Sequence, residues 1–171
     1  MEAENLGVQV VETRKRVLGE EHPDTLNSMA NLASTYKTQG RWEEAENLEV
    51  QVVEARKRVF GEEHPDTLTS KSNLASTYWC QGRLKEAEEL EVQVVEKRKR
   101  VWGEKHPSTL STMANLAVTW KSQGRLNDAV DLMETCFHYR QQVLGKDHPE
   151  TASALSLLTE WQKDLETGDT Q

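Results

Sequence analysis

The sequence predicts an all-α protein built from stacked pairs of helices, and three observations support this prediction. A stretch with the pattern Gly-x-x-His-Pro recurs four times, each copy about 42 residues after the last, which is the signature of a repeat array. Between the copies, apolar residues recur at the i, i+3, i+4 spacing of amphipathic helices. Each copy joins a glycine, which favours a helix end, to a proline, which favours the first turn of the next helix. The copies begin at Gly19, Gly61, Gly103 and Gly145.

Composition narrows the class of protein further. The 171 residues carry a net charge of -8 and are only 36% hydrophobic, with a mean hydropathy of -0.76. A repeat stack has a thin core and a large surface, so it tolerates such polarity. The acidic balance argues against nucleic acid or an anionic membrane as a partner, and no apolar run approaches the roughly 18 residues needed to span a membrane. Cys80 and Cys136 lie in different repeats, so we expect free thiols in a reducing, cytoplasmic compartment.

The chain is expected to form a single array of one partial repeat, three full repeats and a final helix. Each full repeat holds a helix A, a tight glycine turn, a longer helix B and the Gly-x-x-His-Pro joint. Acidic residues open helices and basic residues close them, which complements the helix dipole. The predicted segments within 1–171 are 1–19 for a helix B without its helix A, 20–61, 62–103 and 104–145 for the full repeats, 146–166 for a final helix A, and 167–171 for a frayed tail.

The apolar spacing places eight helices in this frame. In the first helix A, Leu26, Met29, Leu32 and Tyr36 share one face, and the helix stops at Gly40. The other helices A repeat this face, and the helices B carry alanine, leucine and valine at the same helical spacing. The expected helices B are 3–18, 42–61, 84–102 and 126–144, and the expected helices A are 23–40, 68–81, 110–123 and 151–165.

A recurring set of small, aliphatic and aromatic residues carries a family resemblance. Leu32, Ala33, Tyr36, Gly40 and Ala45 resemble the signature of a tetratricopeptide repeat. The usual unit has about 34 residues, whereas helix B here is about two turns longer. The chain therefore resembles the longer variety found in kinesin light chains and, more closely, the near-identical repeats at the sensor ends of fungal NOD-like receptors. The same set recurs as Leu74, Ala75, Tyr78, Gly82 and Ala87, and as Leu116, Ala117, Trp120, Gly124 and Ala129.

This resemblance implies a right-handed α-solenoid of antiparallel helix pairs, with a concave groove lined by the helices A that binds a peptide or a protein segment. The chain departs from the family pattern where an aromatic residue is usual in helix B, since Glu49, Glu91 and Met133 stand there. The last helix also departs, with Leu157, Thr159 and Gln162 at signature positions, and so looks like an end cap.

Two repeated motifs invite a chemical interpretation that we reject. His22, His64, His106 and His148 sit in successive joints, and neighbouring repeats place equivalent atoms about 8–10 Å apart, too far to share a zinc ion whose ligands lie about 2 Å away. We interpret them as joint residues at helix starts. The basic triplets 14–16, 56–58 and 98–100 close helices and are interpreted as solvated charges. No nucleotide-binding, protease or hydrolase motif occurs, so we expect no enzyme, no metal and no cofactor.

The informative signal is where otherwise similar repeats differ. Most differences within helix A fall at one edge, which in this family lines the groove, so they indicate ligand contacts. The alternative is drift at exposed positions, because helix B also varies at Thr13, Ala55 and Lys97. The candidate binding residues at variable positions are Asn27, Ala30, Lys37, Thr38, Thr69, Ser72, Trp79, Cys80, Ser111, Lys121 and Ser122.

Asn31, Asn73 and Asn115 share that face and do not vary. An amide offers donors and an acceptor together, which suits holding an extended peptide backbone, and the family's groove asparagines match these positions. The alternative is hydrogen bonding between helices of the array. Trp79 is a candidate aromatic anchor, with packing over the neighbouring repeat as its alternative.

Two functions follow from these features. The first is a protein-interaction module whose groove binds a protein or peptide, with Lys37, Lys71 and Lys121 favouring acidic or aromatic-acidic segments. The second is a structural spacer that self-associates through its unpaired first helix, whose apolar side includes Leu6 and Val10.

Overall fold

The structure, a computed structural model, describes residues 2–168, with side chains from residue 4 to residue 168. Within this part the chain forms eight helices and no strand, which confirms the all-α prediction. The helices A begin at the prolines of the joints, up to three residues earlier than apolar spacing alone indicated. Of the expected tail, Thr167 ends the last helix, Gly168 follows it, and 169–171 lie outside the described residues. The helices are α1 Glu2–Leu18, α2 Pro23–Thr38, α3 Trp42–Phe60, α4 Pro65–Cys80, α5 Leu84–Trp102, α6 Pro107–Ser122, α7 Leu126–Leu144 and α8 Pro149–Thr167.

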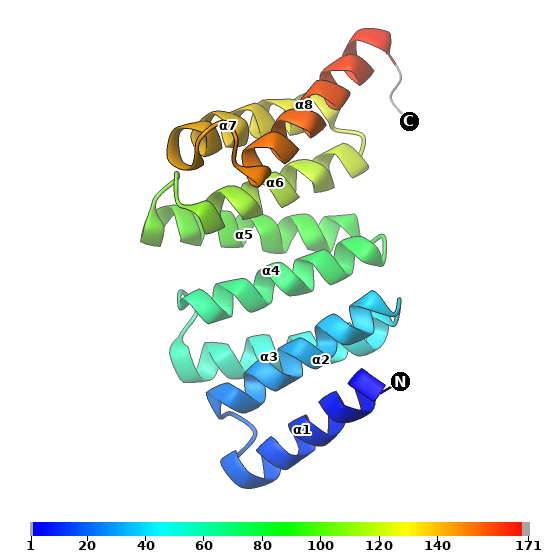
Figure 1. Ribbon diagram of the computed structural model, residues 1–171, viewed down its shortest axis with the longest axis vertical. Coiled ribbons are helices and arrows are strands. Elements are labelled where there is room, and N and C mark those ends of the chain that lie inside the picture. Colours follow the sequence, from blue (N-terminus) through cyan, green and yellow to red (C-terminus); the bar gives the residue numbers. More distant parts are fainter. Residues whose placement is uncertain (1, 169–171) are drawn as a thin grey trace. The chain divides into compact units, whose positions relative to one another are not determined.

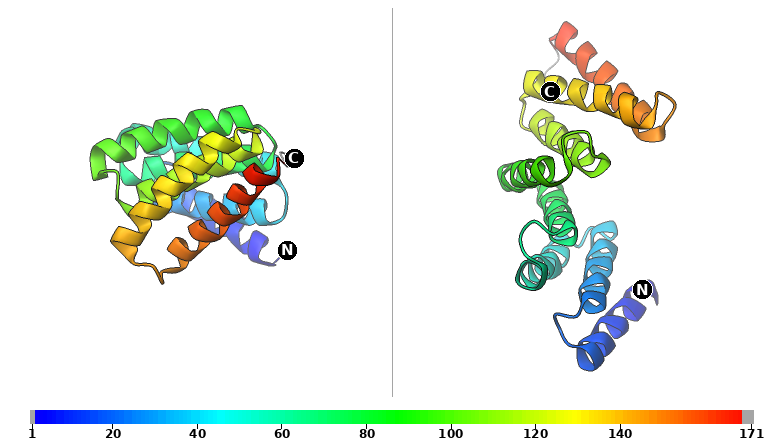
Figure 2. Two further views of the ribbon diagram at one scale, coloured as in Figure 1. Left: turned by 90° about the horizontal axis from the view of Figure 1, so that it is seen from above. Right: turned by 90° about the vertical axis from the view of Figure 1, so that its left-hand side faces the viewer.

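The chain forms two compact units, Met1–Arg83 and Leu84–Gln171. Within each unit every helix packs against the next one along the chain, α1 to α4 in the first and α5 to α8 in the second (Figures 1 and 2). The core of the first unit includes Leu26, Met29 and Val52. The core of the second unit contains more buried residues, and the last of them along the chain is Trp161, which is 2% exposed.

The joint between helix B and the next helix A is built from backbone geometry and one side-chain cap. Its glycine adopts φ of +98° at Gly19 and +93° at Gly61, a region that other residues avoid. At the start of each helix A, a histidine Nδ1 accepts a hydrogen bond from the backbone N–H two residues later, at 3.1–3.2 Å. Proline occupies the first helical turn, where its missing N–H costs nothing. The interpretation of the four histidines as joint residues is therefore confirmed.

An arginine of each helix B spans this joint, and the interpretation of the basic triplets as solvated is wrong for Arg56 and Arg98, which are buried. Arg56 is only 6% exposed. It donates to the carbonyl oxygen of Asp66 at 3.1 Å and to the hydroxyl of Ser70 at 2.7 Å, both on α4. Its second nitrogen reaches the amide oxygen of Asn27 on α2 at 2.5 Å. The guanidinium therefore ties one helix B to the helices A on both sides of it.

The same arginine contact recurs at every joint, always to the carbonyl ten residues ahead. Arg14, Arg98 and Arg140 donate to the carbonyl oxygens of residues 24, 108 and 150. The burial that this contact requires lowers the pKa of Arg98, as expected for a cation withdrawn from water. We call these four contacts the arginine staples.

A buried carboxyl lies in the middle of two helices B. Glu49 is 5% exposed and accepts a hydrogen bond of 2.6 Å from the Thr77 hydroxyl of α4. Glu91 is 3% exposed, and its Oε2 has no hydrogen-bond partner among the described residues. Burial raises the pKa of Glu91 to about 7, and the neighbouring Thr119 offsets this only in part.

In the third helix B the same two positions are apolar. Met133 on α7 and Trp161 on α8, at the repeat positions of Glu91 and Thr119, are 0% and 2% exposed. The fold thus accepts either a carboxyl with a hydroxyl or two apolar side chains at these two repeat positions. The apolar pair avoids the cost of burying a charge.

The arginine staple gives a first test. Arg56→Ala removes a buried donor from the Asp66 carbonyl and the Ser70 hydroxyl and leaves these two groups only their bond to each other, so we expect the free energy of unfolding to fall by roughly 2–3 kcal/mol. The matched control is Arg58→Ala in the same helix, because Arg58 is 60% exposed and pairs only with exposed Glu21. Urea unfolding of both variants measures the difference, and equal losses would contradict the staple.

The buried carboxyl gives a second test through pH. The ordinary carboxyl pKa of 4.5 applies to the unfolded chain, whereas Glu91 in the folded protein has a pKa of about 7. The folded state therefore holds the proton more tightly, so the stability that Glu91 provides is full below pH 4.5 and is lost as pH rises through 7. We expect Glu91→Met, the residue found at position 133, to raise the free energy of unfolding by roughly 2–3 kcal/mol at pH 8 and by less at pH 5.

Glu91→Gln is the control for this pH test, since it removes the titrating group without adding apolar surface. Urea unfolding between pH 5 and pH 8 compares the slopes of stability against pH for the three proteins. We expect both variants to show a flatter slope than the parent, and an unchanged slope would contradict the raised pKa.

Candidate protein-binding surface

The three invariant asparagines lie on exposed faces of helices A. Asn31 on α2, Asn73 on α4 and Asn115 on α6 are all exposed. Their side-chain amides make no hydrogen bond within residues 4–168, so they do not join helices to one another. In the first unit, α2 and α4 touch directly, because Lys37 Nζ donates to Ser76 Oγ at 3.1 Å. Asn31 and Asn73 therefore stand on adjoining helices, each with free donors and a free acceptor.

The candidate residues with longer side chains are partly committed to contacts within the chain. Asn27 accepts the hydrogen bond from Arg56, and Lys37 is half-buried beside Ser76. Lys121 on α6 lies 3.0 Å from the Asp164 carboxylate and 3.3 Å from the Glu160 carboxylate, both on α8. The positive charge of Lys121 is thus matched within its own unit.

The small candidate residues fall into two groups. Four hydroxyls donate to carbonyls three or four residues earlier in their own helices, as expected for serine and threonine inside helices. They are Thr38, Ser72, Ser111 and Ser122. The remaining candidates are Thr69, which is exposed, Ala30 and Cys80, which are half-buried, and Trp79, which is 41% exposed. By contrast, Lys71, which was expected to favour acidic segments, is only 8% exposed and lies on the buried side of α4.

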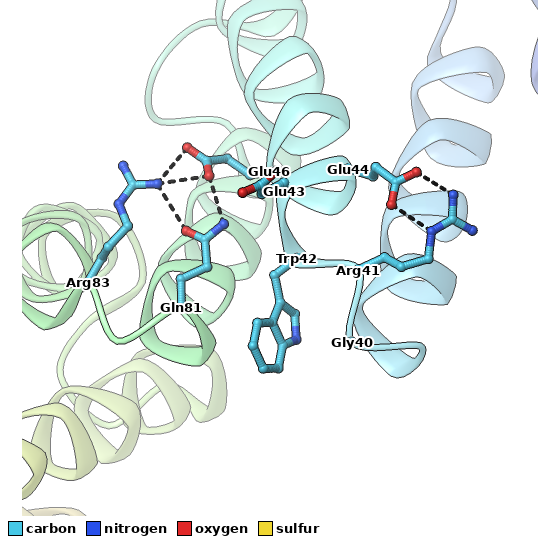
Figure 3. A pocket seen from close by; sticks show the side chains of 8 residues that line it. All are labelled: Gly40, Arg41, Trp42, Glu43, Glu44, Glu46, Gln81 and Arg83. Carbon is cyan, nitrogen blue, oxygen red and sulfur yellow. Dashed lines mark hydrogen bonds and ion pairs between the residues drawn. The ribbon is translucent and has the colours of Figure 1, made fainter.

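A polar cluster at the turn between helices A and B was not foreseen from the sequence. Arg83 donates to both oxygens of Glu46 on α3 at 2.8 Å, and Gln81 donates to the same carboxylate at 2.8 Å (Figure 3). The Arg83 guanidinium also lies 4.1 Å from the centre of the Tyr78 ring. We call these four residues a polar clamp. Glu46, Gln81 and Arg83 line a cavity of about 630 Å³ that is also lined by the exposed Trp42.

The polar clamp recurs in the chain, which indicates a structural role. In the second unit Glu88 accepts hydrogen bonds from Trp120, Gln123 and Arg125. Burial raises the pKa of Glu88, but these hydrogen bonds outweigh burial and the pKa is lowered overall. The equivalent set in the first repeat is Glu4, Tyr36, Gln39 and Arg41. The signal in the sequence was a glutamate and an arginine 37 residues apart, three times.

The other chemical groups give no sign of catalysis or metal binding. No cluster of three His, Cys, Asp or Glu side chains within the described part of the chain could hold a metal ion. Both cysteines are free thiols, and burial raises the pKa of the Cys136 thiol to about 12, so it stays protonated and unreactive. None of the helices α1 to α8 is long and apolar enough to cross a membrane.

Repeated helix pairs, joined by the same turn of glycine, histidine and proline, define a helical-repeat scaffold of the kind that mediates protein–protein interaction. The chain belongs to the tetratricopeptide repeat family, whose pattern matches residues 2–24, 25–66, 67–108 and 109–150. None of the curated proteins matches the sequence.

Solved structures support the same assignment. A putative kinesin light chain with nearly identical repeats, from Podosopora anserina, is 32% identical in a single-substitution form, with a TM-score of 0.83, covering 99% of this chain and 81% of that one. Another crystal structure of that protein gives 32% identity, a TM-score of 0.81 and the same coverage. BtubC from P. vanneervenii, at 24% identity and a TM-score of 0.83 over 99% of this chain and 67% of its own, shows the fold alone. The predicted α-solenoid of kinesin-light-chain-like repeats is therefore confirmed.

Proposed function

We propose that the protein binds an extended segment of a partner protein along its helices A, without covalent chemistry. The observation that carries this proposal is the set of exposed amides at Asn31, Asn73 and Asn115, which are free to bond a peptide backbone. A primary amide can donate to a backbone carbonyl and accept from a backbone N–H at once. This grips a chain whatever its side chains are, so the varied residues nearby would supply selectivity.

Selectivity in this proposal depends on residues that differ between repeats. Trp79, at 41% exposed, is suited to an apolar or aromatic side chain of the partner. A preference for acidic segments depends mainly on Lys37, because the charge of Lys121 is matched by Glu160 and Asp164. Small residues such as Ser72 and Ser111 leave room at the same edge. We also propose that the protein is cytoplasmic and that its repeats are of the type found in fungal NOD-like receptors.

The amide proposal predicts a specific loss of binding. Replacing Asn31, Asn73 and Asn115 together with Ala should leave helicity and the urea midpoint nearly unchanged, since their side chains are exposed. Each lost hydrogen bond is worth roughly 1 kcal/mol, so we expect affinity for a peptide selected from a displayed library to fall by roughly 100-fold. Isothermal titration calorimetry measures this.

A matched triple variant on the helices B controls for general surface effects. Gln9, Gln93 and Gln141 are exposed amide side chains on α1, α5 and α7, and their replacement with Ala should leave the affinity unchanged. Equal affinities for the parent and the asparagine variant would contradict the proposal.

Self-association is a second candidate function, favoured by one observation. Leu6 and Val17 on α1 are 63% and 69% exposed, the largest exposures among the exposed large hydrophobic side chains. At the same repeat positions Leu48 is half-buried and Val59 is 42% exposed. An apolar helix face of this kind favours contact with another apolar surface, including a second copy.

Self-association predicts a size that depends on concentration. Sedimentation velocity between about 10 and 500 μM, the range where weak apolar contacts with Kd in the micromolar range appear, should show growth for the parent and a monomer for Leu6→Glu. The control is Val101→Glu, at a 43% exposed valine of α5, which should behave as the parent does. A strict monomer at all concentrations would rule out this function.

A further inference from the structure

One position of helix B varies more than its surroundings and lines a pocket in the first unit. Residue 55 is alanine in α3, whereas the residue two repeats later is Tyr139 in α7. Beside Ala55 the first unit has a cavity of about 310 Å³, lined by the buried Leu26 and Met29 and by the exposed Val50. This volume lies at the lower end of the range for small-ligand pockets. The rim is charged and includes Glu20, Glu21 and Arg58.

The second unit shows what occupies the same place when the side chain is large. Tyr139 packs against the core cluster that contains Leu110 and Met113, the residues two repeats after Leu26 and Met29. Its hydroxyl donates to the Glu104 carboxylate at 3.2 Å. The Lys105 ammonium lies 5.4 Å from the centre of the ring. The ring is therefore held by an apolar floor, a carboxylate for its hydroxyl and a cation at its face.

The first unit keeps the apolar side chains and the carboxylate of this arrangement, but it has Glu21 at the repeat position of Lys105. Glu20 is the residue two repeats before Glu104, and its carboxylate makes no hydrogen bond or ion pair within residues 4–168. A polar contact also spans the rim in both units, but the basic residue stands on opposite sides of it. In the first unit Arg58 contacts Glu21 at 2.7 Å, and at the same repeat positions in the second unit Lys105 contacts Gln142 at 2.8 Å. Lys15 lines the same pocket and supplies a cation.

We propose that the pocket beside Ala55 receives a tyrosine side chain from a partner protein, with Glu20 accepting the phenol hydrogen bond. The phenol would stand where the ring of Tyr139 stands in the second unit. Because the pocket is lined by α1, α2, α3 and the joint between α1 and α2, it is separate from the asparagine face. It is a second contact site, and it does not depend on the proposed role of Asn31, Asn73 and Asn115.

The first arm of the test uses stability, with no ligand. Ala55→Tyr supplies the missing ring from the protein itself, as Tyr139 does. We expect this variant to unfold at an equal or higher urea concentration than the parent, because a cavity is filled and a hydrogen bond to Glu20 is gained. A lower midpoint or a failure to fold would show that the pocket is not shaped for a phenol ring and would overturn the proposal.

The second arm uses a small probe, N-acetyl-L-tyrosinamide, followed by NMR of the backbone amides. We expect saturable shifts at Val50, Gln51, Glu54 and Ala55 in the parent and none in Ala55→Tyr. Glu20→Gln, which keeps the pocket open, should weaken the tyrosine probe several-fold while leaving N-acetyl-L-phenylalaninamide unchanged. An absence of saturable shifts in the parent would overturn the proposal. So would equal binding to both proteins, or shifts that depend on protein concentration alone, which would indicate a second copy in the pocket.

Discussion

The arginine that spans each joint is the contact on which the repeat geometry depends. A helix ends at a glycine and another begins four residues later, so the two helices need a fixed angle to bury their apolar faces together. Arg56 sets that angle by reaching the carbonyl of Asp66 and the hydroxyl of Ser70. Arg140 keeps the carbonyl contact although its hydroxyl partner is replaced by Ala154, and it then pairs with the Glu150 carboxylate at 3.4 Å.

The arginine staples and the polar clamps give charged side chains hydrogen-bond partners within each unit. The asparagines at 31, 73 and 115, on the exposed faces of the helices A, are not needed for these contacts. Glu46 and Glu88 accept hydrogen bonds within the polar clamps, and the joint histidines accept the hydrogen bonds that cap the helices A. The side-chain amides of Asn31, Asn73 and Asn115 are among the exposed polar groups that make no hydrogen bond within residues 4–168. A surface of this kind suits reversible binding of a polypeptide backbone, and it differs from the charged or nucleophilic constellations that catalysis requires.

The fold could be predicted from the sequence because its signals are local and repeated. Glycine, histidine and proline mark each joint, and apolar spacing marks each helix, so the element order followed directly. The clamp at Glu46 had a signal in its 37-residue spacing to Arg83. The contacts of Arg56 could not be foreseen, because Arg56 and Arg58 look like equally solvated charges in the sequence. Only the packing of neighbouring helices distinguishes them. The pocket beside Ala55 was hidden for the same reason, since a variable position in helix B looks like drift until Tyr139 shows what the space holds.

The central claim is that the helices A bind a partner through their asparagine amides, and the side-chain amide resonances test it directly. Protein carrying 15N-asparagine is titrated with a peptide selected from a displayed library. We expect shifts for Asn31, Asn73 and Asn115, while the resonances of Asn5, Asn47 and Asn127, which are exposed on the helices B, stay unchanged. Shifts confined to the asparagines of the helices B, with the other three unmoved, would contradict it.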